Sequence, residues 1–151
     1  MKNLIALSLL LVSSVTNAQE FTLSKLQEYN KLSVEDFKTE VKSKGFIYHD
    51  KTNSEAFDLY EYSKFENKIN YKIAKSVSKD ALFTYISYDT SNKKEFDLFI
   101  NDIKKLGYKL TEKGTSYKIP FEIYTLNKQE IWFNFPDPND KNLKSYNITV
   151  Y

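Results

Sequence analysis

Residues 33–46 read SVEDFKTEVKSKGF, and residues 92–108 read NKKEFDLFINDIKKLGY. Both stretches carry apolar residues at the three- and four-residue spacing of one helical face, with charged residues between them. The two sets match at a constant offset of 62 positions: Val34, Phe37, Val41, Gly45 and Phe46 recur as Phe96, Phe99, Ile103, Gly107 and Tyr108. The stretches therefore predict two amphipathic helices that belong to two copies of one unit.

Both predicted helices are bounded by residues that favour caps. Ser33 precedes the first helix, and Asn92 precedes the second, with Glu95 three residues later as in a capping box. Gly45 and Gly107 follow the last helical positions, where glycine tolerates the left-handed backbone that ends a helix. The chain is expected to leave each helix at its glycine and enter a strand.

Each helix is followed by segments rich in aromatic and β-branched residues, several of which alternate as in a sheet with one wet face. The expected strands are 46–50, 57–64, 69–76 and 82–88, and then 108–112, 117–126, 130–135 and 145–151. The expected turns between strands are 51–53, 66–68, 113–114, 127–128 and 136–142. The sequence thus predicts an α+β fold. Two tandem helix-plus-four-strand repeats, about 32–90 and 91–151, form one antiparallel sheet with the helices on one face.

Three features of this architecture stay open. Residues 19–31 fit a short helix or an edge strand equally well. The last strand, 146–151, alternates, and at a sheet edge it could pair between molecules, so the oligomeric state is not predicted. The pattern also does not decide which face of the sheet the helices cover.

The first 18 residues follow the order of a secretory signal peptide. Residues 1–3 form a short basic start, residues 4–12 are apolar except for one serine, and residues 16–18 are small. Cleavage after Ala18 would leave 19–151 as a single α+β domain. The apolar run is much shorter than the ~20 residues that span a bilayer. We therefore expect an exported protein, periplasmic or extracellular, that does not span a membrane.

Composition narrows the class of partner. The 22 basic residues are all lysine, and against 20 acidic residues they give a formal net charge of +2. Without arginine the chain lacks the planar fork that favours phosphates and base edges, so a nucleic-acid partner is not expected. The chain also has no cysteine. Its stability outside the cytoplasm must then come from packing, without disulfides.

No pattern in the sequence predicts a catalytic or metal site. The one histidine, His49, is interpreted as an exposed residue at a strand end, and the three glycines form neither a nucleophile elbow nor a phosphate loop. A zinc site needs three or four ligands, which one histidine without cysteine does not favour. Residues 137–148 fail the calcium-loop pattern at positions five, six and twelve, so 136–139 is interpreted as a plain loop. We expect a non-enzymatic protein with no cofactor and no metal.

Aromatic residues make up 16% of the chain, and the sequence places some of them on the sheet surface. Side chains alternate between the two faces of a strand. If Phe57 and Leu59 face the helices, then Tyr60 and Tyr62 face the open side. Tyrosine is also a good strand former, so ordinary sheet surface is an alternative interpretation for each of them.

The same alternation applies to the second repeat. If Ile131 and Phe133 face inward, Trp132 faces outward, and an inward Ile123 leaves Tyr124 outward. Large amphipathic rings are enriched at the centres of protein interfaces. The predicted partner-binding residues are Tyr60, Tyr62, Tyr124 and Trp132.

The tandem arrangement resembles that of two secreted bacterial groups, the β-lactamase inhibitory proteins and the PepSY-like domains. Residues 37–48 and 99–110 carry the likeness, and the repeat covers most of 19–151. The resemblance implies a non-catalytic, protein-binding role for the open sheet face. The chain departs from the β-lactamase inhibitors in lacking the cysteines that staple them.

These observations together predict a secreted or periplasmic, non-enzymatic binding protein. It would hold a protein or peptide on an open aromatic sheet face, as an inhibitor, an immunity protein or an accessory subunit. The alternative is an envelope-associated carbohydrate-binding protein, because tyrosine and tryptophan also stack on sugars. A sugar platform would need coplanar rings, whereas a protein interface would need a contiguous patch.

Overall fold

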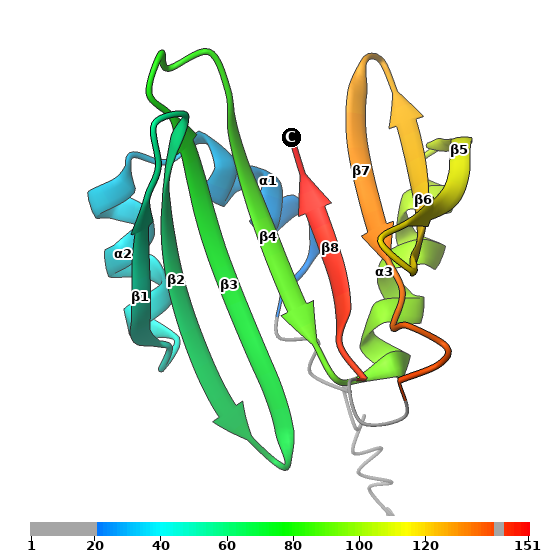
Figure 1. The fold of residues 1–151 in the computed structure, drawn as a ribbon, viewed down its shortest axis with the longest axis horizontal. Helices are drawn as coiled ribbons and strands as arrows, with labels where there is room; N and C mark the ends of the chain where they lie inside the picture. Colours follow the sequence, from blue (N-terminus) through cyan, green and yellow to red (C-terminus); the bar gives the residue numbers. More distant parts are fainter. Residues whose placement is uncertain (1–20, 141–143) are drawn as a thin grey trace, which may run out of the picture.

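The computed structural model describes residues 21–140 and 144–151 (Figure 1). Within these residues the chain has three helices and one antiparallel sheet of eight strands, so the predicted α+β class is confirmed. The helices are α1 (Leu23–Lys31), α2 (Val34–Ser43) and α3 (Lys93–Lys105). The strands are β1 (Ile47–Asn53), β2 (Phe57–Glu66), β3 (Ile69–Ser78), β4 (Thr84–Thr90), β5 (Lys109–Ser116), β6 (Ile119–Leu126), β7 (Gln129–Asn134) and β8 (Tyr146–Val150). The predicted signal peptide, residues 1–18, lies outside the described residues.

The strands lie in the order β1-β2-β3-β4-β8-β7-β6-β5. β1 to β4 form one antiparallel meander and β5 to β8 a second, and the two meet where β4 pairs with β8. The last strand therefore lies in the middle of the sheet (Figure 1), and the edges are β1 and β5. Pairing between molecules through β8, which the sequence left open, is excluded because both sides of β8 are already occupied.

Residues 23–31, for which the sequence allowed helix or strand, form α1. Its start is capped by Thr22, whose hydroxyl oxygen accepts a hydrogen bond from the backbone N–H of Lys25 at 3.2 Å. Leu23, Leu26 and Tyr29 are buried, because their three-residue spacing places them on one side of a helix. α1 packs against β4 and β8, at the centre of the sheet.

The caps predicted for α2 and α3 are confirmed. The Ser33 hydroxyl oxygen accepts the backbone N–H three residues on at 3.1 Å, and the Asn92 side chain accepts the N–H two residues on at 3.1 Å. Gly45 and Gly107 follow the helices with φ values of 81° and 94°. These values lie in the left-handed region, where a side chain would strain the backbone.

Glu95 does not complete the capping box. Its buried carboxylate accepts hydrogen bonds from the hydroxyls of Tyr88 and Thr90, both at 2.9 Å. The Thr90 hydroxyl oxygen in turn accepts the backbone N–H of Asn92 at 3.1 Å. The threonine hydroxyl thus lies between the two groups that a capping box joins directly, and it ties the start of α3 to β4.

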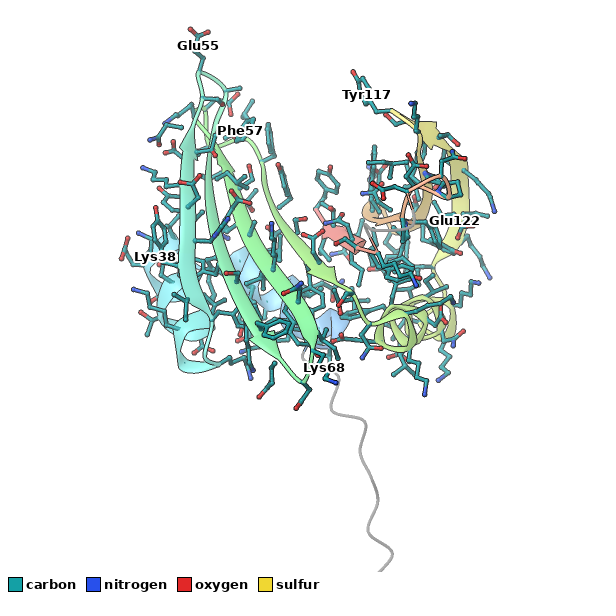
Figure 2. The ribbon with its side chains drawn as sticks, turned by 60° about the horizontal axis from the view of Figure 1, so that its bottom comes forward. Lys38, Glu55, Phe57, Lys68, Tyr117 and Glu122 are labelled. Atoms are coloured by element: carbon teal, nitrogen blue, oxygen red, sulfur yellow. The ribbon has the colours of Figure 1, made fainter. Side chains whose placement is uncertain are left out.

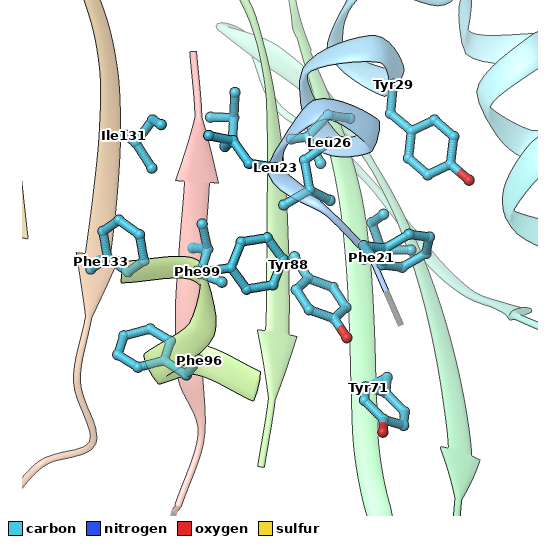
Figure 3. Packing of buried hydrophobic residues seen from close by; sticks show 14 of the residues in the cluster. Phe21, Leu23, Leu26, Tyr29, Tyr71, Tyr88, Phe96, Phe99, Ile131 and Phe133 are labelled. Carbon is cyan, nitrogen blue, oxygen red and sulfur yellow. The ribbon is translucent and has the colours of Figure 1, made fainter. Parts of the chain in front are cut away.

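The core lies between the sheet and the helices, which cover one face as predicted (Figure 1). Figure 3 shows aromatic rings from both layers meeting there. The rings of Phe21 and Tyr88 lie 5.1 Å apart in an edge-to-face arrangement, and those of Phe96 on α3 and Phe133 on β7 lie 5.4 Å apart. Such pairs add to the free energy that burial of the rings provides.

Three tight hairpins turn on two residues that both have positive φ: Asn67-Lys68, Tyr117-Lys118 and Asn127-Lys128. Strand pairing closes immediately on either side of each turn. This is the pattern of type I′ turns, whose twist matches that of the strands they join. The expected turns at 51–53 and 113–114 are wrong, because 51–53 continue β1 and 113–114 lie inside β5.

Glycine in place of Lys68, Lys118 or Lys128 should stabilise the fold. Each lysine has φ between 66° and 70°, and a side chain in this region costs about 1–2 kcal/mol, part of which glycine loses to its larger unfolded-state entropy. We expect each variant to gain about 0.5–1 kcal/mol in the free energy of unfolding, measured in urea. Lys109→Gly, at the first residue of β5, is the matched control and should destabilise. Loss of stability in all three hairpin variants would contradict the assigned turns.

Candidate functional site

Cross-strand pairing fixes which side chains share a face of the sheet, because directly opposed residues project to the same side. The face that carries fully buried Ile73, Tyr88 and Ile148 is the one that the helices cover. The opposite face carries none of the three described helices, and we call it the open face. Figure 2 shows the sheet curving, with β1–β3 and β5–β6 standing on the two sides of β8 and the helices outside. The open face is therefore concave.

Tyr60 and Tyr62 lie on the helix-covered face, so the prediction that they line the open face is wrong. Tyr62 is only 1% exposed, and its ring lies 5.9 Å from that of Phe37 on α2. The Lys38 ammonium of α2 lies 4.9 Å from the centre of the Tyr60 ring. Burial raises the pKa of Tyr62 above its usual value. These two tyrosines belong to the packing of α2 on the sheet.

Tyr124 is also covered by a helix, and its prediction is wrong for the same reason. Its ring packs edge-to-face on Phe133 at 5.7 Å, and the Lys104 ammonium of α3 lies 5.7 Å from its centre. Burial and the hydrogen bond that its hydroxyl donates to Glu122 raise the pKa of Tyr124 to about 12. Of the four predicted residues, only Trp132 lies on the open face, since buried core residues flank it in β7.

The error follows from the composition of β2. This strand alternates two apolar sets, with Phe57, Leu59 and Phe65 on one side and Tyr60 and Tyr62 on the other. Alternation shows that two faces exist, but it does not say which one the helices cover. The prediction assigns the set without hydroxyls to the core. A tyrosine ring buries nearly as much apolar surface as a phenylalanine ring.

Four aromatic rings form a contiguous run on the open face, which we call the aromatic patch: Phe121 of β6, Trp132 of β7, Tyr151 after β8 and Tyr85 of β4. Successive ring centres lie 6.0, 5.8 and 5.5 Å apart, with interplanar angles of 20°, 54° and 45°. Sequence reasoning missed three of the four. The position of Tyr85 next to buried Ile86 is the signal that could have found it.

Two adjoining depressions cross the open face beside the aromatic patch. Their volumes are about 610 and about 580 Å³, and they share Asp89 and Ser145. Tyr117, which is 97% exposed, stands at the wall of the second one. We call the two depressions the transverse groove, defined by floor residues from five neighbouring strands: Glu61, Ser63, Lys72, Asp89, Asn147 and Asn134. The groove runs across the strands and not along them.

Hydrogen bonds around Asn147 hold the centre of the groove floor. The Asn147 amide donates to the Ser87 hydroxyl oxygen at 2.6 Å, and its carbonyl oxygen accepts from Asn134 and Thr149, both at 3.0 Å. These bonds join side chains of β4, β8 and β7. The floor is therefore positioned before any partner binds.

Asp89 is the half-buried carboxylate in the middle of this floor. Its contact with the Ser145 hydroxyl is 3.5 Å long, beyond the usual range for such bonds. Lys72 lies directly opposite on β3, yet no ion pair joins the two within the described chain. Burial raises the pKa of Asp89 above its usual value, although Asn147 and Lys72 oppose the shift. Hydrogen bonds with Asn147 and Ser145 and the charge of Lys72 thus offset the effect of burial only in part.

Gly114 leaves room for the end ring of the aromatic patch. It lies opposite Phe121 in the β5–β6 pair, and a Cβ at this glycine would lie 2.9 Å from the Phe121 ring. No carbon atom tolerates such an approach, so any side chain at position 114 displaces the ring. The glycine is therefore explained by the ring that lies over it and not by a turn.

Gly114→Ala should change the fluorescence of Trp132, the single tryptophan of the chain. Displacing the Phe121 ring uncovers the indole, because the two rings lie 6.0 Å apart. We expect a red-shifted emission maximum, measured on the folded protein. Ser116→Ala, in the same strand and on the same face, should leave the spectrum unchanged. An unchanged spectrum in Gly114→Ala would contradict this packing.

No protein family, curated protein or solved structure matches the chain. Within the described ranges, no three histidine, aspartate or glutamate side chains lie close enough together to hold a metal ion. In that same part of the chain, no helix combines the length and apolarity needed to cross a membrane. His49, expected at a strand end, lies within β1 where the register with β2 shifts, and it lines one end of the transverse groove.

Proposed function

We propose that the chain is an exported, non-enzymatic protein that binds a protein or peptide partner on its open face, as an inhibitor, an immunity protein or an accessory subunit. The aromatic patch, on a concave face that carries none of the three described helices, is the observation that carries this proposal. The patch extends from β6 to β4 and so includes the central part of the sheet. Aromatic clusters with such central positions supply most of the binding energy at interfaces.

The ring geometry favours a protein over a glycan, which is the alternative ligand. A sugar stacks on rings that share a plane, whereas Tyr151 is tilted by 54° from Trp132 and by 45° from Tyr85. A tilted, contiguous patch fits the irregular apolar surface of a protein segment. Export is supported by the order of charged, apolar and small residues in the first 18 positions.

The proposal includes an origin of the fold in two copies of one unit, residues 32–90 and 91–151. Each half is a helix followed by four strands. Each first strand shifts register with its partner at an equivalent point, after Tyr48 in β1 and after Leu110 in β5, which are 62 positions apart. The resemblance to β-lactamase inhibitory proteins and PepSY-like domains implies the same arrangement and a binding role.

Affinity capture tests the proposed function. The purified chain is the bait for envelope and secreted fractions of the source cell, and mass spectrometry identifies what it retains. A second bait, with Trp132→Ala and Tyr151→Ala, is the matched control. We expect one stoichiometric protein that the first bait retains and the second loses. Equal retention by both baits would contradict binding at the open face, and binding to a cell-wall glycan array instead would favour the alternative.

A further inference from the structure

The transverse groove has the opposite charge balance to the whole chain. Among the described residues, its two depressions are lined by four carboxylates, those of Glu61, Asp89, Asp137 and Asp140, and by the two lysines Lys72 and Lys144. The chain as a whole has 22 basic and 20 acidic residues. Beyond the groove, the register places three more carboxylates on the open face, Asp50, Glu112 and Glu130, against Lys109. An acidic face on a basic protein complements a basic partner.

Three of the open-face carboxylates, Asp50, Glu61 and Asp89, also lie near like charge. Asp50 and Glu61 lie directly opposite each other in the β1–β2 pair, an arrangement of like charges that destabilises a sheet. Glu61 also repels the half-buried Asp89. Within the described residues, no ion pair reaches any of these three groups. A cation brought by a partner would relieve this repulsion.

We propose that the partner bound on the open face carries a lysine or arginine whose cationic group enters the transverse groove between Asp89 and Glu61. This inference rests on the proposed function and specifies the chemistry of the partner. Hydrogen bonds around Asn147 hold the floor beside Asp89. A charge-assisted hydrogen bond to a half-buried carboxylate is stronger than one on an exposed surface.

The distance between Asp89 and the aromatic patch sets the spacing between the basic residue of the partner and its apolar anchor. Asp89 on β4 and Trp132 on β7 are two strands and one two-residue step apart. From the usual spacings of strands and residues, Asp89 and Trp132 are roughly 10 Å apart across the strands and roughly 7 Å apart along them, or about 12 Å in all. An extended segment of about three to four residues has this length. The bound segment should therefore carry its basic residue three or four positions from an apolar anchor.

Selection from a phage-displayed random dodecapeptide library against the purified full chain tests the inference. Peptides selected by the wild type and lost with Trp132→Ala should be enriched in lysine or arginine three or four positions from an aromatic residue. Selection on Asp89→Asn with Glu61→Gln should lose the basic enrichment and keep the aromatic one. Glu112→Gln, outside the groove on the same face, is the control and should behave as the wild type.

Titration calorimetry with one selected arginine peptide, and with its citrulline analogue, isolates the pairing. We expect Asp89→Asn to weaken binding of the arginine peptide about tenfold or more. The citrulline analogue should bind the wild type and Asp89→Asn with equal affinity. Lys72→Met should raise the affinity for the arginine peptide, because the substitution removes a competing cation from the groove. Equal losses for both peptides with Asp89→Asn would overturn the direct pairing.

The outcomes separate this inference from the proposed function. Trp132-dependent peptides without a basic excess, or with an acidic one, would overturn the inference and leave the open face as a binding surface. Absence of any Trp132-dependent peptide would overturn both. Enrichment of basic residues that persists in Asp89→Asn with Glu61→Gln would place the acidic site elsewhere and overturn the inference alone.

Discussion

Lys75→Ala should lower the free energy of unfolding by about 3–5 kcal/mol, from the loss of the buried stem and of two hydrogen bonds. Lys75 is 1% exposed on the helix-covered face of β3. Its ammonium donates to the backbone carbonyls of Tyr29 at 3.0 Å and Asn30 at 2.9 Å, in the last turn of α1. The same two carbonyls also accept the Leu32 backbone N–H at 3.3 Å and the Thr84 hydroxyl at 3.2 Å. Lys75 adds a charge-assisted bond to each of them, at a helix end where the dipole also favours a cation. Equilibrium unfolding in urea at pH 7 measures the loss.

Lys75→Met separates the stem from the ammonium. Methionine fills most of the same volume but donates no hydrogen bond, so the carbonyls of Tyr29 and Asn30 would each lose a charge-assisted bond. This loss should cost about 1–3 kcal/mol. We expect its stability to lie between those of wild type and Lys75→Ala. A Lys75→Met protein as stable as the wild type would show that the ammonium does not hold the end of α1.

The same lysine should make stability depend on pH. Burial lowers the pKa of Lys75 to about 8 from 10.5, so between these values the unfolded chain holds the proton and the folded chain releases it. The free energy of unfolding should therefore rise with pH from about 8, by up to about 1.4 kcal/mol per pH unit. Above pH 10 the raised pKa values of Tyr62 and Tyr124 should lower the free energy of unfolding. In this range the tyrosines of the unfolded chain lose their protons more readily than those of the folded chain. Lys75→Met should lack the rise between pH 8 and 10.

Trp132→Ala should weaken binding of the captured partner at least 30-fold, the effect of losing about 2 kcal/mol or more at a central aromatic residue. Trp132 lies between Phe121 and Tyr151, in the middle of the aromatic patch. Its side chain is outside the core between sheet and helices, so the free energy of unfolding should change by less than about 1 kcal/mol. The dissociation constant and the urea midpoint, measured on the same preparation, test both parts.

Tyr62→Ala is the matched control for Trp132→Ala. It should lower the stability of the fold and leave binding of the partner unchanged. Its ring is buried against α2, and removing a core aromatic ring costs about 3–5 kcal/mol of stability. Binding by the fraction that remains folded should be unchanged. A folded Tyr62→Ala protein with impaired binding and normal stability would contradict the assignment of Tyr62 to the core.

Local signals in the sequence predicted most of the elements. The caps at Ser33 and Asn92 and the glycines after the helices act through neighbouring backbone groups, so a short stretch contains all the information they need. The predicted turn at 113–114 is wrong, because Gly114 lies inside a strand and not in a turn. Gly114 is instead required by the ring of Phe121, seven positions later on the paired strand. The sequence does not show that the two residues are paired.

The candidate site was harder to predict because it depends on pairing between distant strands. Period-2 alternation divided the strand residues into two faces, but the helix-covered face could not be chosen without knowing what packs on Phe37. The transverse groove depends on the pairing of β4 with β8, whose partners are 56 (Thr90 and Tyr146) to 64 (Ile86 and Val150) positions apart. Asp89 and Asn147 come together only through that pairing. Neither residue carries a local motif.

The central place of β8 also determines when the molecule can fold during synthesis. Until the residues of β8 leave the ribosome, β4 has a free edge and β7 lacks its neighbour, so the two meanders have no strand that joins them. The pairing that completes the sheet is the most distant in sequence, which makes it slow and dependent on the whole described chain being present. A nascent chain stopped before Tyr146 therefore exposes two unpaired strand edges, which are sites for chaperone binding or aggregation.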